Sequence, residues 1–116
     1  MTGHHIVSTF KMLDCPYKFL DKGENIETFL DVSIRNAELI PLKFCNHNFD
    51  PVGYSCCYLL AESHISIHTW PELNALNLDV FVCNFLTENT EKAKTLYVYM
   101  KQFFKPRIIE LKEIER

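Results

Sequence analysis

The fold is decided by residues 54–70, which read YSCCYLLAESHISIHTW. Residues 54–61 form a nearly continuous apolar run, as expected for a central strand that is buried on both faces. Residues 65–70 continue in strand chemistry until Pro71, which lacks the N–H that a sheet ladder needs. Polar side chains crowd into the segment Glu62–Glu72, ESHISIHTWPE. The sequence therefore predicts a sheet at the centre of the chain that carries a segment suited to chemistry.

The residues that follow predict another strand, a helix and a last strand. Residues 75–83 alternate in the manner of a half-buried strand. One face would carry Leu76, Leu78, Val80 and Val82, and the other Asn77, Asp79, Phe81 and Cys83. Thr90 is a suitable N-cap for a helix, whose apolar stripe would be Ala93, Leu96, Tyr97, Met100 and Phe104. Pro106 would end this helix, and residues 107–114, RIIELKEI, complete the sheet.

The residues that precede the central run repeat the order of strand, helix and strand. Residues 4–10 and 40–49 have strand composition, and residues 24–39 place apolar side chains at helical spacing, with Asn25 as a possible cap. A turn is expected at DPVG, residues 50–53. We therefore predict an α+β fold, a two-layer sandwich with a mostly antiparallel sheet and two helices on one face. No linker divides the chain, so residues 1–116 are expected to form one domain.

Composition excludes several classes of partner. A formal charge of −3 offers no basic surface for nucleic acid. No stretch approaches the ~20 apolar residues that a membrane span needs, and no basic region followed by an apolar run opens the chain. The odd number of cysteines, 5, favours free thiols in a reducing compartment. We therefore expect a cytoplasmic protein that binds neither nucleic acid nor membrane.

The residues of the polar segment are compatible with several kinds of site. Ser63 and His68 could be nucleophile and base, but Ser63 lacks the G-x-S-x-G context of many hydrolases. His64 and His68 would lie about 13 Å apart on one strand, too far to bind one ion, so we expect no metal. Taken singly, a strand serine, Cys83 and Phe49 are more often structural than functional. Their arrangement carries the functional argument.

The segment LLAESHISIHTWPE, residues 59–72, followed by LDVFVC at residues 78–83, closely resembles the short prokaryotic form of S-adenosylmethionine decarboxylase. The resemblance extends from GHHIVSTF through NFDPVGYS to the last helix. It implies a self-processing enzyme of polyamine and spermidine synthesis whose cofactor is a pyruvoyl group derived from Ser63. Cleavage between Glu62 and Ser63 would leave chains 1–62 and 63–116.

The same resemblance implies roles for individual residues. His68 would remove the Ser63 α-proton during processing, as suits a group that titrates near neutrality. Ser55 would assist processing by hydrogen bonding. Cys83 would reprotonate the substrate's Cα after it has joined the pyruvoyl carbonyl as a Schiff base and lost CO2.

Substrate binding follows from the family as well. Phe49 and His68 would stack on the adenine ring of S-adenosylmethionine, and Glu72 would accept hydrogen bonds from both ribose hydroxyls. The family's site lies near a dimer interface, so we expect a homodimer of processed pairs. A chain this short also has little material for a deep cleft of its own.

Two alternatives remain open at this stage. The chain departs from the family pattern at residues 73–78, LNALNL, at Cys56 and at Val82. Some relatives with this processing motif decarboxylate arginine or ornithine, and Asp50, Asn77 or Asp79 could hold the distal cation of such a substrate. Asp50 could equally cap the turn at Pro51. An inactive regulatory homologue would be expected to lack Ser63, His68 or Cys83, and all three are present.

Overall fold

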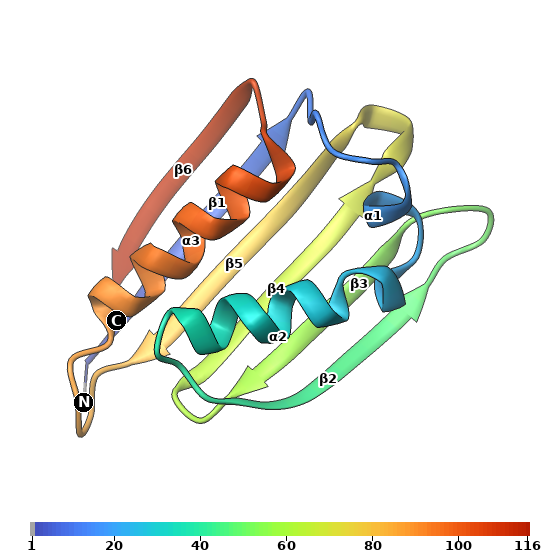
Figure 1. Cartoon of the computed structure of the whole chain (residues 1–116). Helices are drawn as coiled ribbons and strands as arrows, with labels where there is room; N and C mark the ends of the chain where they lie inside the picture. The colour runs from blue at the N-terminus through green and yellow to red at the C-terminus, as the bar shows by residue number, and fades with distance from the viewer. Residues whose placement is uncertain (1) are drawn as a thin grey trace.

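The computed structural model describes residues 2–116, which form one antiparallel sheet with helices packed against it (Figure 1). In chain order the elements are β1 (Gly3–Lys11), α1 (Lys18–Asp21), the 3-10 turn η1 (Gly23–Asn25), α2 (Glu27–Asn36), β2 (Pro41–Asn48), β3 (Tyr54–Leu60), β4 (Ser63–Trp70), the 3-10 turn η2 (Pro71–Leu73), β5 (Ala75–Cys83), α3 (Thr90–Phe104) and β6 (Ile108–Glu115). The 6 strands lie in the order β2-β3-β4-β5-β1-β6. The predicted α+β fold is confirmed.

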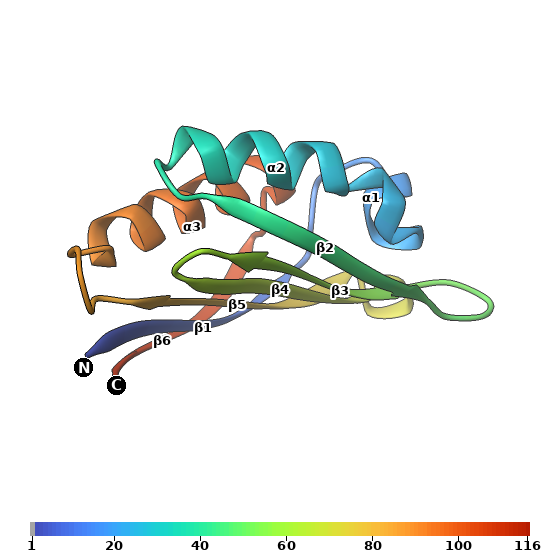
Figure 2. The same ribbon diagram turned by 90° about the horizontal axis from the view of Figure 1, so that it is seen from below.

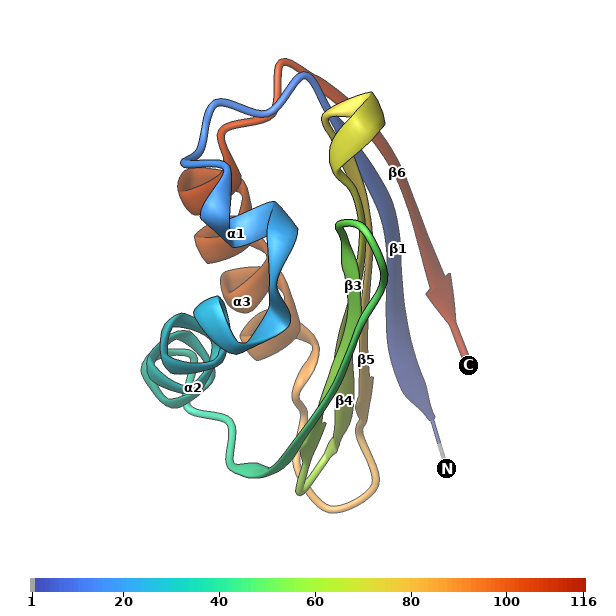
Figure 3. The ribbon, with the colours of Figure 1, turned by 90° about the vertical axis from the view of Figure 1, so that its right-hand side faces the viewer.

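All the helices lie on one side of the sheet, so the molecule has two layers (Figures 2 and 3). The predicted alternation of residues 75–83 is confirmed. Its apolar side is fully buried and belongs to the core, together with the apolar stripe of α3. The opposite side of the sheet, which we call the open face, carries no helix in the described chain (Figure 3). It displays Asn77, Asp79, Phe81 and Cys83 from β5 and their neighbours on adjacent strands.

Several details differ from the sequence prediction. The helix expected over residues 24–39 is divided into η1 and the shorter α2, and α1 was not foreseen. Thr90 is the first residue of α3, and Asn89 occupies the N-cap position. The strand at residues 54–61 is not buried on both faces, because Leu59 is 48% exposed on the open face. The apolar composition of β3 therefore exceeds what one covering layer of helices requires.

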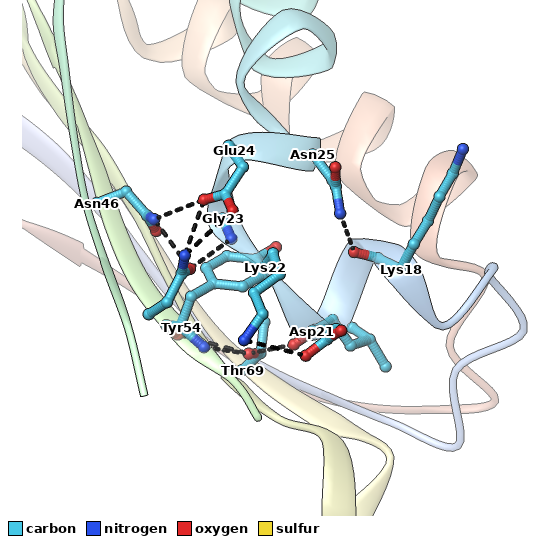
Figure 4. Close-up of polar contacts among 11 residues, drawn as sticks. Lys18, Asp21, Lys22, Gly23, Glu24, Asn25, Asn46, Tyr54 and Thr69 are labelled. Atoms are coloured by element: carbon cyan, nitrogen blue, oxygen red, sulfur yellow. Dashed lines mark hydrogen bonds and ion pairs between the residues drawn. The ribbon is translucent and has the colours of Figure 1, made fainter. Parts of the chain in front are cut away.

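A network of hydrogen bonds attaches the segment from α1 to η1 to the strands (Figure 4). The buried Thr69 hydroxyl donates to the carbonyl oxygen of Leu20 at 2.8 Å and accepts the backbone N–H of Tyr54 at 2.9 Å. The backbone N–H of Gly53 donates to the carbonyl oxygen of Asp21 at 3.1 Å. Further along, both Asn46 and Asn48 bond to the Glu24 carboxylate. These contacts fix the β2–β3 loop and the end of β4.

None of the described helices is both long enough and apolar enough to cross a lipid bilayer.

The substitution Thr69→Val is expected to destabilise the fold. Valine has nearly the shape of threonine but would leave the Tyr54 N–H and the Leu20 carbonyl without their buried partner. A buried polar group left unpaired costs about 1–3 kcal/mol, so we expect a loss of about 2 kcal/mol in the free energy of unfolding. Urea denaturation measures this quantity. The control Thr69→Ser retains the hydroxyl and should retain most of the stability; equal losses in both variants would contradict the assignment.

Candidate active site

The bond between Glu62 and Ser63 lies at the turn of the β3–β4 hairpin. Leu60 pairs with Ser63, so the connection is the two-residue loop Ala61–Glu62. Two-residue hairpins usually require positive φ at the loop residues, for which glycine or asparagine is favoured. Neither loop residue is among the described residues with positive φ; Ser63 is, with φ 148°. The strain of this hairpin therefore falls on Ser63.

The carbonyl group of Glu62 is held by a hydrogen bond from the next strand. The backbone N–H of Cys83 donates to the Glu62 carbonyl oxygen at 2.8 Å. In β5 this N–H comes one residue after Val82, which is the pairing partner of Ser63. A backbone N–H aimed at this oxygen can stabilise the negative charge that develops when the carbonyl carbon is attacked. We refer to Glu62, Ser63 and Cys83 as the cleavage centre.

A second group of residues lines a pocket of about 380 Å³ on the open face, towards the other end of the sheet. Ser55 and His68 are paired across β3 and β4, and Ser55 Oγ lies 2.7 Å from His68 Nδ1. Phe49, Glu72 and Trp70 complete the walls. Phe49 is 48% exposed, so one face of its ring is available to a ligand. We refer to Phe49, Ser55, His68 and Glu72 as the binding group.

Within one chain, the structure does not bring the cleavage centre and the binding group together. His68 lies five positions after Ser63 in β4, which amounts to roughly 16 Å at ~3.3 Å per residue. On β5 the corresponding positions are Val82 and Asn77, the partners of these two residues. His68 cannot reach the α-proton of Ser63 in its own chain. The sequence indicated the residues of both groups but not the distance that separates the two groups.

The open face between the two groups carries polar and aromatic side chains. His5 and His64 pack on either side of Phe81, with ring centroids 5.7 Å and 5.9 Å from it. His5 Nε2 lies 3.6 Å from Asp79 Oδ1. Burial lowers the pKa of His64, and the neighbouring charges of His5 and Arg116 lower it further, against the opposing effect of Asp79. His64, near the centre of this face, therefore binds a proton less readily than a histidine in water.

The sequence indicated no role for Trp70 and Asn89, and it assigned Asn77 only in part. Trp70 donates from Nε1 to Asn77 Oδ1 at 2.8 Å, and Asn77 donates from Nδ2 to Thr9 Oγ1 at 3.0 Å. Asn89 donates from Nδ2 to the carbonyl oxygen of Cys83 at 2.9 Å. An asparagine directly before a helix is an ordinary capping signal, so the sequence gives no indication that its side chain turns towards the cleavage centre.

Comparison with known proteins identifies the family of the chain. The family model described as S-adenosylmethionine decarboxylase matches residues 5–116. The chain belongs to the S-adenosylmethionine decarboxylase family. It is 34% identical to the S-adenosylmethionine decarboxylase proenzyme of Archaeoglobus fulgidus over 106 residues, which cover 91% of this chain and 89% of that one.

Other relatives extend the comparison. The proenzyme of the same name from Methanococcus maripaludis strain S2 is 36% identical over 116 residues, covering 98% of this chain and 88% of the relative. The crystal structure of the adenosylmethionine decarboxylase of Aquifex aeolicus superposes with a TM-score of 0.86 at 32% identity, covering 98% of this chain and 89% of that structure. The fold and the family membership predicted from the sequence are both confirmed.

The lowered pKa of His64 predicts acid sensitivity of the fold. The folded state binds this proton less readily than the unfolded chain, in which the pKa of a histidine is near its ordinary value of 6.5. Stability from this group is therefore present above about pH 6.5 and is lost as the pH falls below it. In a Ser63→Ala background, which removes the hydroxyl at the expected cleavage site, we expect His64→Asn to flatten the fall of melting temperature between about pH 6.5 and 5. Curves of melting temperature against pH that run parallel with and without His64→Asn would contradict this assignment.

Proposed function

We propose that the chain is a proenzyme that cleaves itself between Glu62 and Ser63 and then decarboxylates S-adenosylmethionine, giving the aminopropyl donor for spermidine synthesis. The observation that carries the proposal is the cleavage centre, where a strained Ser63 follows a carbonyl that a backbone N–H already holds. Strained backbone of this kind persists where the surrounding structure enforces it, and it clusters at functional sites. Family membership supplies the reaction class.

The first stage of processing needs only residues of the cleavage centre. Ser63 Oγ attacks the carbonyl carbon of Glu62, and the carbonyl oxygen becomes an oxyanion opposite the Cys83 N–H. Collapse of this adduct breaks the bond from the Glu62 carbon to the Ser63 nitrogen, which takes up a proton. The peptide bond has then become an ester, and the strain at Ser63 favours its departure from the original geometry.

The second stage needs a base. Removal of the Ser63 α-proton expels the Glu62 carboxylate, which becomes the end of chain 1–62, and leaves dehydroalanine at position 63. Addition of water with loss of ammonia yields the pyruvoyl group at the start of chain 63–116. His68 has the chemistry for the proton removal, and Ser55 orients it through the contact at Nδ1. His68 cannot reach the Ser63 of its own chain. The His68 that removes this α-proton therefore belongs to a second copy of the chain.

A two-fold dimer formed through the open faces satisfies this requirement. In an isologous interface, each group of one copy meets the other group of its partner, so two complete sites form at once. Cys83, Ser55 and His68 hold strand positions on the uncovered side of the sheet, whereas Ser63 begins β4 at the hairpin turn and pairs with Leu60 and Val82, whose side chains are buried in the core. Half-buried Phe81, His5 and His64 lie between the two groups and would be covered by the partner. A dimer through the open face is therefore part of the proposal.

The pyruvoyl group fits the residues present, because its precursor Ser63 lies beside Cys83 on the neighbouring strand. When formed, this group binds the substrate's amino group covalently and withdraws the electrons released by loss of CO2. Cys83 holds a proton close to the reacting centre and would return it to Cα. The five cysteines form no disulfide in the described chain, which agrees with the cytoplasmic location that we propose.

The binding group favours a nucleoside substrate. Phe49 and His68 offer rings for stacking on adenine, and the exposed Glu72 offers two oxygens to ribose hydroxyls. The alternative of a basic amino acid would need a free acceptor for its distal cation. Asn77 is engaged by Trp70 and Thr9, and Asp79 faces His5, so neither is free. Asp50 does line the pocket beside Phe49, so a direct assay must decide.

Mass spectrometry of the purified, denatured protein tests self-cleavage. We expect two fragments that correspond to residues 1–62 and 63–116, the second with a blocked amino terminus because the pyruvoyl group replaces its amine. The Ser63→Ala variant should remain a single folded and inactive chain, since it lacks both the attacking oxygen and the pyruvoyl precursor. An intact wild-type chain under active conditions would exclude the pyruvoyl mechanism.

Release of CO2 from S-adenosylmethionine, arginine and ornithine tests the substrate in the same preparation. We expect turnover of S-adenosylmethionine alone, and Glu72→Gln should raise KM more than it lowers kcat, because it weakens a ribose contact remote from the reacting atoms. Turnover of only a basic amino acid would overturn the substrate and leave the cleavage mechanism standing.

Coexpression of Ser63→Ala and His68→Ala chains tests the shared site. Each variant alone should remain uncleaved. In a mixed dimer, Ser63 of the His68→Ala copy meets His68 of its partner, so one site is complete. With tags of different mass on the two chains, we expect up to about half of the His68→Ala chains to be cleaved, given random pairing in a two-fold dimer.

The Ser63→Ala chains in the same mixture provide the internal control, because they should remain intact. A mixture with no cleavage, under conditions in which the wild-type protein is cleaved, would show that His68 does not act across the interface.

A further inference from the structure

The side chain of Asn89 does not serve the helix that it precedes. It occupies the N-cap position of α3, where an asparagine oxygen normally accepts a backbone N–H of the first turn. Here the side chain makes no capping hydrogen bond, and the N–H of Thr90 is bound by the Glu88 carboxylate instead. Asn89 is only 2% exposed. A buried polar side chain that forgoes its usual local role indicates that it is used elsewhere.

The amide of Asn89 is directed at the last residue of β5. Its Nδ2 donates to the Cys83 carbonyl oxygen at 2.9 Å, while its backbone N–H donates to Asn84 Oδ1 at 2.7 Å. Its Oδ1 is buried and has no hydrogen-bond partner among the described residues. The contact with a carbonyl fixes which end of the amide is the nitrogen, because an oxygen in that place would face another acceptor.

Cys83 is consequently held through both of its backbone polar groups. Its carbonyl accepts from Asn89, and its N–H donates to the Glu62 carbonyl oxygen at 2.8 Å. Cys83 is the last residue of β5. Its side towards β1 is paired with Gly3, and the following N–H, that of Asn84, donates to the Thr2 carbonyl oxygen at 2.8 Å, whereas the pairing with β4 ends one residue earlier, at Val82. Asn89 and Glu62 also line one cavity of about 370 Å³ together with Cys83. The start of α3 is thereby connected to the scissile bond by two successive hydrogen bonds.

We propose that Asn89 is a positioning residue for self-cleavage: its Nδ2–H holds the Cys83 peptide so that the Cys83 N–H faces the oxyanion that forms at Glu62. This inference rests on the proposed self-cleavage, since it concerns the same bond. Without the donor, the Cys83 peptide would lose one of the two hydrogen bonds on its β4 side, and the Cys83 N–H would be displaced from the oxygen that it stabilises. Small displacements of such a donor are costly in rate.

The variant Asn89→Asp tests the donor specifically. It preserves the shape of the side chain and a favourable N-cap residue, and it sacrifices no acceptor bond because Oδ1 has none. At pH 8.5 the introduced carboxylate cannot donate to the Cys83 carbonyl, and we expect cleavage to slow by roughly ten- to a hundredfold. Because position 89 is buried, the pKa of the introduced carboxyl is expected to be raised, so that at pH 5.5 a substantial share is protonated and can donate again, and the deficit relative to wild type should narrow.

The measurement is a pulse of cell-free synthesis of the full chain, a chase in buffers between pH 5.5 and 8.5, and separation of the fragments on denaturing gels. Rates are compared with wild type at each pH and equal chain concentration, so that the pH dependence of the general base cancels. Asn25→Asp is the matched control, because Asn25 also donates from Nδ2 to a backbone carbonyl, that of Lys18 at 3.0 Å, in a segment remote from Glu62 (Figure 4). It should cleave like wild type at every pH.

The outcomes separate this inference from the proposed function. A wild-type chain that is never cleaved would overturn both, whereas a wild-type rate for Asn89→Asp at pH 8.5 would overturn only the role of Asn89. A deficit that does not change with pH would likewise overturn it. Circular dichroism establishes that the variant is folded. If it is not, Asn89→Ser decides, since it retains a capping residue but has too short a side chain to reach Cys83; it should be slow at every pH, and a wild-type rate would overturn the proposal.

Discussion

The pairing of β4 with β5 is the constraint on which the site depends. Its register sets Ser63 opposite Val82, so that the next N–H along β5, that of Cys83, meets the carbonyl of Glu62. The same register sets His68 opposite Asn77, several residues away along both strands. A shift by one residue would move every side chain of β4 to the other face of the sheet. The pairing of β4 with β5 therefore forms the proposed cleavage centre and also separates it from His68, the proposed base.

That separation explains why the open face matters. A small protein with one layer of helices buries one face of its sheet and leaves the other for solvent or a partner. Of the residues with roles in the proposed reaction, Ser55, His68 and Cys83 hold positions on the uncovered face and Ser63 lies at the hairpin turn beside it, in two groups that are separated along the strands. In the proposed dimer, a second copy would supply what a larger chain builds with a cleft, and the half-buried histidines around Phe81 would lie in its interior.

Several polar side chains of this chain hold backbone groups and leave other side chains free for chemistry. Thr69 bonds to Tyr54 and Leu20 beneath the binding group, and Asn89 bonds to Cys83 behind the cleavage centre. In each case the strand geometry by itself would leave a backbone group without a partner. Such contacts are costly to remove because the backbone partner would remain buried and unpaired. They give two short strands the rigidity that a reactive site requires.

The sequence by itself determined the α+β class, the alternation of residues 75–83, the strands on either side of Glu62 and the family, because periodicity and a specific local motif carry that information. It also indicated Ser63, His68 and Cys83 as chemically notable residues. Only the tertiary structure decided that Ser63 takes the strain of the hairpin, that His68 is remote from it, and that Asn89 turns towards Cys83. Those properties depend on strand register and on contacts between residues far apart in the chain, which local patterns do not encode.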